Sequence, residues 1–143
     1  MPDYKKILLV VDLSDDSQLV GERAKAIAAC YRSEITLLHV VEYVPVEPMG
    51  EALLPTVQIE SELVERARKK LTELAGKLGL NDARQLVETG GIKTEIIRAA
   101  QRLAADLIVL GSRERHGLAI LLNFTEDTIL HAAPCDVLAV RLH

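Results

Sequence analysis

The residues best suited to chemistry lie in the last third of the chain, where an apolar run is followed by a polar loop. The run at 106–110 leads into Gly111, Ser112 and Arg113. Further on, Thr125 is a good N-cap residue for a helix with acidic side chains in its first turn. A strand that ends in glycine, a loop and a helix N-terminus can bind phosphate, because N–H groups at a helix start are unpaired and partly positive. One glycine is weak evidence, so a plain tight turn is the alternative.

A second set of polar residues follows the first apolar run of the chain. The run at 6–11 is aliphatic after its lysine and ends at Asp12, and such an unbroken run is typical of a strand covered on both faces. Ser14 is placed to act as an N-cap, with two acidic residues behind it. If the first and fourth strands are neighbours, Asp12 and Gly111 meet at one crevice beyond the strand ends.

Residues with catalytic potential are scattered along the chain rather than clustered. There is no Walker A lysine motif, no Gly-x-Ser-x-Gly and no His/Glu cluster at zinc spacing. His39 lies inside an apolar strand, which favours a hydrogen-bonded core histidine over a catalytic base. Cys30 and Cys135 lack metal-ligand spacing, and we expect both to be small buried hydrophobic residues. We therefore predict no catalytic residues, no metal site and no enzymatic activity; a weak ATPase is the lowest-ranked reading.

The elements that must position these residues alternate between strands and helices. Strands are predicted at 6–11, 35–41, 84–88, 106–110 and 136–142, and helices at 15–31, about 59–78, between 91 and 103, and 125–132. A long loop is expected at about 42–56, where prolines and a glycine interrupt the periodicity. Leu19, Ile59 and Leu63 belong to the predicted inward stripes, and Gly79 is expected to cap the second helix. This alternation predicts an α/β fold with a doubly wound parallel sheet and helices on both faces.

Composition and charge exclude several classes of protein. The 143 residues are enough for a single domain over 1–143, and 49% hydrophobic with 3% aromatic residues predicts an aliphatic core. A formal net charge of −4 argues against a basic nucleic-acid-binding face. No apolar run approaches the roughly 18 residues of a membrane span, and the N-terminus lacks the features of a signal peptide. We expect a cytoplasmic protein with no nucleic-acid or membrane partner.

A set of short motifs, in this order along the chain, resembles the universal stress protein family. The motifs are Asp12 after its Leu-Leu-Val-Val strand, Leu38-His39-Val40, the stretch from Asp106 to Ser112, Gly117-Leu118 and the stretch from Ala133 to Val140. The resemblance covers essentially the whole chain. It implies a five-stranded sheet of order 3-2-1-4-5, usually a homodimer paired through the last strand, and in many members a bound adenine nucleotide.

The chain departs from the family's nucleotide-binding pattern on the phosphate side. Members that bind ATP carry G-x2-G-x9-G-[ST] after the fourth strand. In this chain the pattern begins at Gly111 and closes at Thr125, but its second and third glycines fall on Glu114 and Phe124. Phe124 adds bulk where the backbone must approach phosphate. Glu114 adds a carboxylate, and like charges about 4 Å apart cost about 4 kcal/mol at an effective dielectric near 20.

The nucleoside side of the pattern is intact, so the resemblance implies AMP or ADP in preference to ATP, as a possible ligand and not a required cofactor. The implied nucleotide-binding residues are Asp12, Leu13, the backbone of Val40, Gly111, Ser112, Arg113, Gly117 and Thr125. The alternative is a nucleotide-free dimeric interaction module, in which the loop and Phe124 fill the former phosphate site.

The last predicted strand lies at a sheet edge if the order is 3-2-1-4-5. Edge strands normally carry proline, inward-pointing charge or a covering segment. The strand from Asp136 to Leu142 has charges only at Asp136 and Arg141, and its interior is apolar. We therefore predict a homodimer in which this strand meets its own copy across a two-fold axis.

Overall fold

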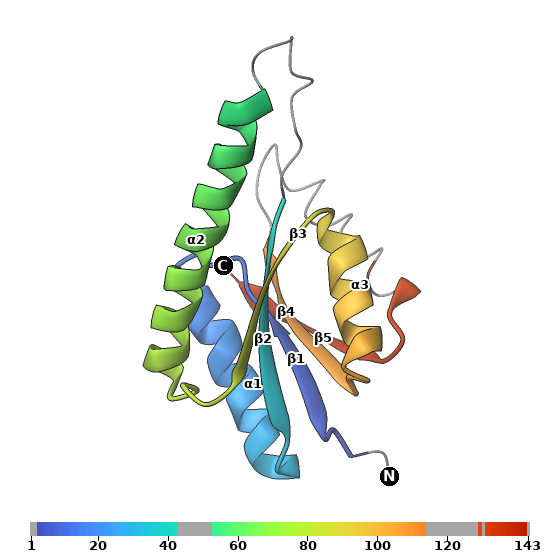
Figure 1. The fold of residues 1–143 in the computed structure, drawn as a ribbon. Coiled ribbons are helices and arrows are strands. Elements are labelled where there is room, and N and C mark those ends of the chain that lie inside the picture. The colour runs from blue at the N-terminus through green and yellow to red at the C-terminus, as the bar shows by residue number, and fades with distance from the viewer. Residues whose placement is uncertain (1–2, 43–52, 114–128, 130, 143) are drawn as a thin grey trace.

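Five parallel strands form one sheet in the order β3-β2-β1-β4-β5. The computed structural model describes residues 3–42, 53–113, 129 and 131–142 of the 143. The strands are β1 (Lys6–Val10), β2 (Glu34–Val41), β3 (Arg84–Thr89), β4 (Leu107–Arg113) and β5 (Asp136–Leu142), and the helices are α1 (Ser17–Tyr31), α2 (Leu53–Leu78) and α3 (Ile92–Arg102). The predicted doubly wound α/β fold and its strand order are confirmed, with α1 and α2 on one face and α3 on the other (Figure 1).

Aliphatic side chains cover the sheet on both faces, which explains the unbroken apolar run of β1. Ile7 and Leu9 are buried in the core shared with α1 and α2, whereas Leu8 is buried in the core shared with α3. Because successive side chains of a strand point to opposite faces, every position of this run meets an apolar layer. The expected aliphatic core is therefore present on both sides of the central strand.

The direction of winding reverses between β1 and β4. Strand β1 pairs in parallel with β2 on one side and with β4 on the other. The carboxyl ends of β2, β1 and β4 therefore lie next to one another along the same edge of the sheet (Figure 1). Ligands of doubly wound sheets bind beyond the strand ends at such a reversal.

The start of α1 differs from the prediction. The helix begins at Ser17, and Asp16 occupies the N-cap position without a side-chain capping bond. Ser14 is not the N-cap, because its hydroxyl donates to Asp12 Oδ1 at 2.6 Å. Leu19, predicted to face inward, is 43% exposed because it lies on an outer flank of the helix.

Helix α2 is longer than predicted and extends past the sheet. It begins at Leu53, inside the segment expected to be a loop, since a proline in the first helical turn removes no hydrogen bond of the helix. Ile59 and Leu63 were expected to face inward but are 51% and 36% exposed. The sheet does not reach under that half of the helix (Figure 1). At the other end Gly79 has φ +69°, which confirms the predicted glycine cap.

Three further predictions meet different outcomes. Cys30 is exposed on α1, so its prediction as a buried residue was wrong, while Cys135 is half-buried at the entry of β5. The last predicted helix is helical at 129, 131 and 132, and its earlier part lies outside the described residues. Most of the expected loop at 42–56 lies outside them as well.

Within the described part of the chain, no helix has the length and apolar character needed to span a bilayer.

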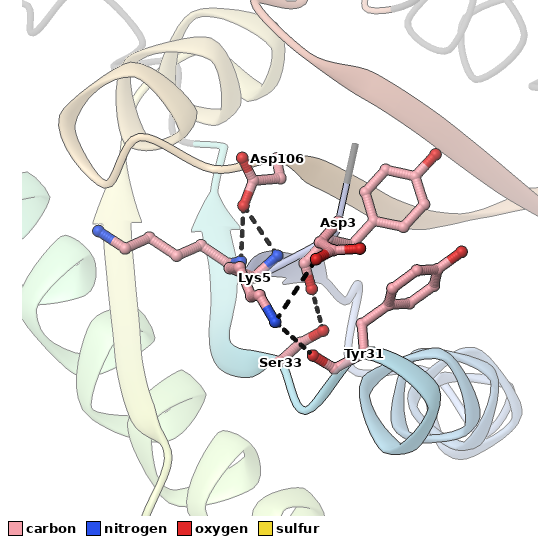
Figure 2. A network of polar contacts seen from close by, with 7 residues as sticks. Asp3, Lys5, Tyr31, Ser33 and Asp106 are labelled. Atoms are coloured by element: carbon pink, nitrogen blue, oxygen red, sulfur yellow. Dashed lines mark hydrogen bonds and ion pairs between the residues drawn. The ribbon is translucent and has the colours of Figure 1, made fainter. Parts of the chain in front are cut away.

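A polar network anchors the amino-terminal end of β1, opposite the edge where the winding reverses (Figure 2). Asp106 Oδ2 accepts the backbone N–H groups of Lys5 and Lys6, both at 2.9 Å. The Lys5 ammonium donates to the carbonyl of Tyr31 at 3.2 Å, and the Ser33 hydroxyl donates to the carbonyl of Tyr4. These contacts join the start of β1 to the end of α1 and to the residue that precedes β4, and we assign them a structural role.

Candidate functional site

Asp12 lies two residues beyond the end of β1 and is held in place by its neighbours in sequence. Its Oδ1 accepts the Ser14 backbone N–H at 2.9 Å, the Ser14 hydroxyl at 2.6 Å and the Ser17 hydroxyl at 3.0 Å. Ser17 is only 2% exposed, and Leu13 adopts the left-handed backbone conformation with φ +63°. The Asp12 side chain is exposed but oriented, because the turn and the first residue of α1 both bind one of its oxygens.

His39 ties the same turn to β2. Its Nδ1 lies 2.8 Å from the carbonyl oxygen of Val11, the residue before Asp12. A carbonyl only accepts hydrogen bonds, so Nδ1 carries the proton and donates. The Val11 N–H in turn donates to the Leu38 carbonyl at 3.0 Å. The predicted hydrogen bond of His39 is confirmed, but the residue is half-buried and not part of the core; the bond places Asp12 relative to β2.

Gly111 lies inside β4 rather than at its end, which corrects the predicted strand boundary. The strand continues to Arg113 because Gly111, Ser112 and Arg113 pair with residues 140–142 of β5. A Cβ on Gly111 would stand 2.7 Å from Leu142 Cδ1 and 3.2 Å from Val20 Cγ2. The missing side chain therefore lets β5 and α1 pack closely against β4, whether or not a ligand binds.

Val40 lies near the carboxyl end of β2 and can offer a ligand only its backbone. The residue is 7% exposed, belongs to the core shared with α3 and pairs with Glu88 of β3. The next residue, Val41, accepts the backbone N–H of Gly90 through its carbonyl at 3.1 Å. The end of β2 is thus bound to the turn that leads from β3 into α3.

The predicted site residues are only partly within the described structure. Asp12 and Leu13 follow β1, Val40 lies in β2, and Gly111 and Ser112 lie in β4, so their strands are adjacent at one edge. Arg113 ends β4. Gly117 and Thr125 lie outside the described residues, as do Glu114 and Phe124. Among the residues that the structure does describe, no group of three or more His, Cys, Asp or Glu could hold a metal ion.

Two residues that support Asp12 were absent from the predicted site. Ser14 was assigned to helix capping and Ser17 was not considered, yet both hydroxyls bind the Asp12 carboxylate. The signal for them is the spacing Asp-x-Ser-x-x-Ser after a buried strand. An aspartate in a turn accepts hydrogen bonds from the residues that follow it, and this pattern would have located both serines.

Comparison with known proteins identifies the relatives of this chain. The model of the universal stress protein family matches residues 3–141. Universal stress protein A homolog 1 of Coxiella burnetii is 42% identical over 138 residues, which cover 96% of each chain. The structure of universal stress protein UspA from Lactobacillus plantarum has a TM-score of 0.75 at 26% identity and covers 99% of this chain and 100% of that one.

A third comparison concerns a structure with a ligand. A universal stress protein solved in complex with cAMP has a TM-score of 0.63 at 19% identity, and the match covers 97% of this chain and 98% of that chain. At this identity the likeness establishes the shared fold, and the ligand is a property of that protein.

Proposed function

The chain belongs to the universal stress protein family, and from this premise we propose that it binds a small adenine nucleotide, AMP or ADP in preference to ATP, as a homodimer. The proposed role is binding without catalysis. A relative of the same fold is known in complex with cAMP, itself an adenine nucleotide.

The observation that carries the proposal is the hydrogen-bonded Asp12 turn at the reversal point of the sheet. Three hydrogen bonds orient the Asp12 carboxylate before any ligand arrives. The β4 backbone at Gly111 and the β2 backbone at Val40 lie on the two neighbouring strands. An oriented carboxylate accepts hydroxyl donors well, so this arrangement suits the ribose end of a nucleoside.

The preference for AMP or ADP rests on sequence at the phosphate end. Glu114 and Phe124 stand where the family's ATP-binding pattern has glycine. A carboxylate repels phosphate oxygens, and the repulsion grows with the number of phosphates. The side chains of Arg113, Arg115 and His116 are the nearest basic groups in sequence.

The test of binding itself is titration of AMP into nucleotide-stripped protein, with Asp12→Ala as the matched variant. We expect the wild-type chain to bind and Asp12→Ala to lose detectable binding, because Asp12 is the charged side chain that we place beside the nucleoside. Unchanged AMP affinity in Asp12→Ala would refute this placement.

A specific observation also favours the second candidate, a nucleotide-free dimeric interaction module. Close packing against Leu142 and Val20 already requires glycine at position 111, so this residue is explained without any ligand. The same titration separates the two candidates, because the interaction module binds neither AMP nor ATP.

The proposed dimer uses the free edge of β5. The strand is at the edge of the sheet, and Leu138 and Ala139 in its middle are exposed, Leu138 by 36%. Backbone groups on the outer side of an edge strand are available for pairing with another chain. A two-fold axis beside β5 would let the strand meet its own copy in antiparallel orientation.

A further inference from the structure

Glu95 is a buried carboxylate that the proposed site leaves without a role. Within the described part of the chain, Glu95 and Ser17 are the polar residues that are buried, and Ser17 is accounted for by its bond to Asp12. The Glu95 side chain is 10% exposed, and its Oε1 accepts a hydrogen bond from Arg98 Nη1 at 2.9 Å. Burial of a charge is costly unless it is paired, and Arg98, whose side chain is 64% exposed, is the cationic partner of Glu95.

The carboxylate of Glu95 lies against the turn between β3 and α3. A Cβ on Gly90 would stand 3.1 Å from Glu95 Oε1 and 3.3 Å from its Cγ. Gly90 has φ +146°, a conformation that L side chains rarely adopt. The next residue, Gly91, is the N-cap of α3, and its carbonyl accepts the Glu95 N–H at 3.0 Å. The Glu95 side chain thus lies next to Gly90, and the Glu95 backbone is bonded to the neighbouring Gly91.

The same turn holds the end of β2. The Gly90 N–H donates to the Val41 carbonyl at 3.1 Å, and Val41 follows the Val40 backbone that we place at the nucleoside. The Glu95 carboxylate therefore lies beside Gly90, and Gly90 is hydrogen-bonded to Val41. We propose that Glu95 is a positioning residue for the nucleoside end of the site: by supporting the Gly90 turn, it sets the end of β2. This inference rests on the proposed nucleotide-binding function and deepens it.

Because these contacts lie at the end of β2, loss of the Glu95 side chain should affect one end of the proposed site and not the other. Glu95 acts on the end of β2, where we place the nucleoside, and not on the residues that follow β4 in sequence, where we place the phosphates. Glu95→Ala should lower the affinities for adenosine and for AMP by the same factor, about tenfold or more. A tenfold loss corresponds to about 1.4 kcal/mol of binding free energy. Glu95→Gln keeps the shape and an oxygen acceptor for Arg98, so it should bind both ligands within about threefold of wild type.

Amide hydrogen exchange supplies a readout that a general loss of stability would not produce. In Glu95→Ala the Gly90 amide should exchange faster relative to the Val11 amide, whose bond to the Leu38 carbonyl lies on the other side of β2. If Glu95→Ala does not fold, Glu95→Asp, which keeps the carboxylate but shortens the side chain by one methylene group, should show the same pattern to a smaller degree. The inference is overturned if the two amides change together, or if folded Glu95→Ala binds AMP within about threefold of wild type. If the wild-type chain binds neither adenosine nor AMP, the proposed function fails, and the exchange comparison still decides whether Glu95 holds the end of β2.

Discussion

At the scale of single residues, the two ends of the candidate site are built in opposite ways. Asp12 is positioned by hydrogen bonds that its neighbours donate, whereas Gly111 matters because it has no side chain. The carboxylate can serve a ligand and its own turn together, since its oxygens accept several donors. The glycine serves the packing of β5 and α1 against β4 first, and it leaves the backbone accessible second.

A glycine-to-alanine pair tests the packing role of Gly111. Gly111→Ala places a methyl group 2.7 Å from Leu142 Cδ1 and should destabilise the fold by about 1–3 kcal/mol through overpacking. The matched control is Gly76→Ala on the exposed surface of α2, where the added Cβ meets only ordinary contact and should stabilise by about 0.5–1 kcal/mol. Urea denaturation measures both. Equal stability of Gly111→Ala and wild type would contradict the close packing.

The two cysteines should differ in reactivity. Burial, with a smaller effect from the carboxylates of Asp136 and Asp106, raises the pKa of the Cys135 thiol, whereas Cys30 is exposed. A raised pKa lowers the thiolate fraction near neutral pH, so Cys135 should react more slowly with a disulfide reagent and gain rate only as pH rises further. Titration of Cys30→Ser and Cys135→Ser chains separates the two thiols, and faster reaction of Cys135 would contradict the account.

At the scale of elements, the sequence predicted the positions of the strands, which depend on local pattern. It missed the exposure of some helix residues, which depends on the elements packed beside them. The five strands were located to within a few residues, and the central strands β1 and β2 most easily, because their apolar runs are buried on both faces. Periodicity carries no information on lateral strand order, so that prediction came from the family resemblance. The stripe of α2 predicted Ile59 and Leu63 as inward-facing, since a stripe does not reveal how far the sheet extends beneath the helix.

The same limit applies to the candidate site. Asp12 and Gly111 were found because each follows or ends an apolar run, and the resemblance placed them together. Cys30 was misplaced because it was judged by residue type, although it lies off the helical stripe that faces the core. Glu95 was missed because a lone glutamate at a helix start is ordinarily exposed to solvent. Its burial depends on the Gly90 turn, which lies next to its side chain.

A pair of leucine variants tests how α2 divides into a packed and a projecting half. Leu71 is fully buried under the helix, whereas Leu63 is 36% exposed on the same element. Leu71→Ala should cost about 2–5 kcal/mol of stability through lost burial and a residual cavity. Leu63→Ala should cost less, about 1–2 kcal/mol, because 36% of Leu63 is already exposed to water in the folded chain and its loss leaves no enclosed cavity. Similar losses for the two variants, measured by urea denaturation, would show that the upper half of α2 is packed in solution.

At the scale of the whole molecule, β5 is the edge strand of the sheet that the described residues form, and the proposed dimer rests on this position. Ala139→Pro should shift the protein to monomer, because proline removes a backbone donor and disrupts edge pairing. Leu138→Lys is the companion variant, since it adds charge to the exposed edge while leaving every backbone group in place. Sedimentation at micromolar concentration measures both, with circular dichroism as the folding control. A wild-type chain that sediments as a monomer would refute the dimer.

The central claim is that the nucleoside half of the site is intact while the phosphate half is altered. The most direct test is calorimetric titration of nucleotide-stripped wild-type protein with AMP and with ATP under the same conditions. We predict that AMP binds at least as tightly as ATP, because Glu114 and Phe124 oppose the additional phosphates. Clearly tighter binding of ATP than of AMP, or no binding of either nucleotide, would contradict this account.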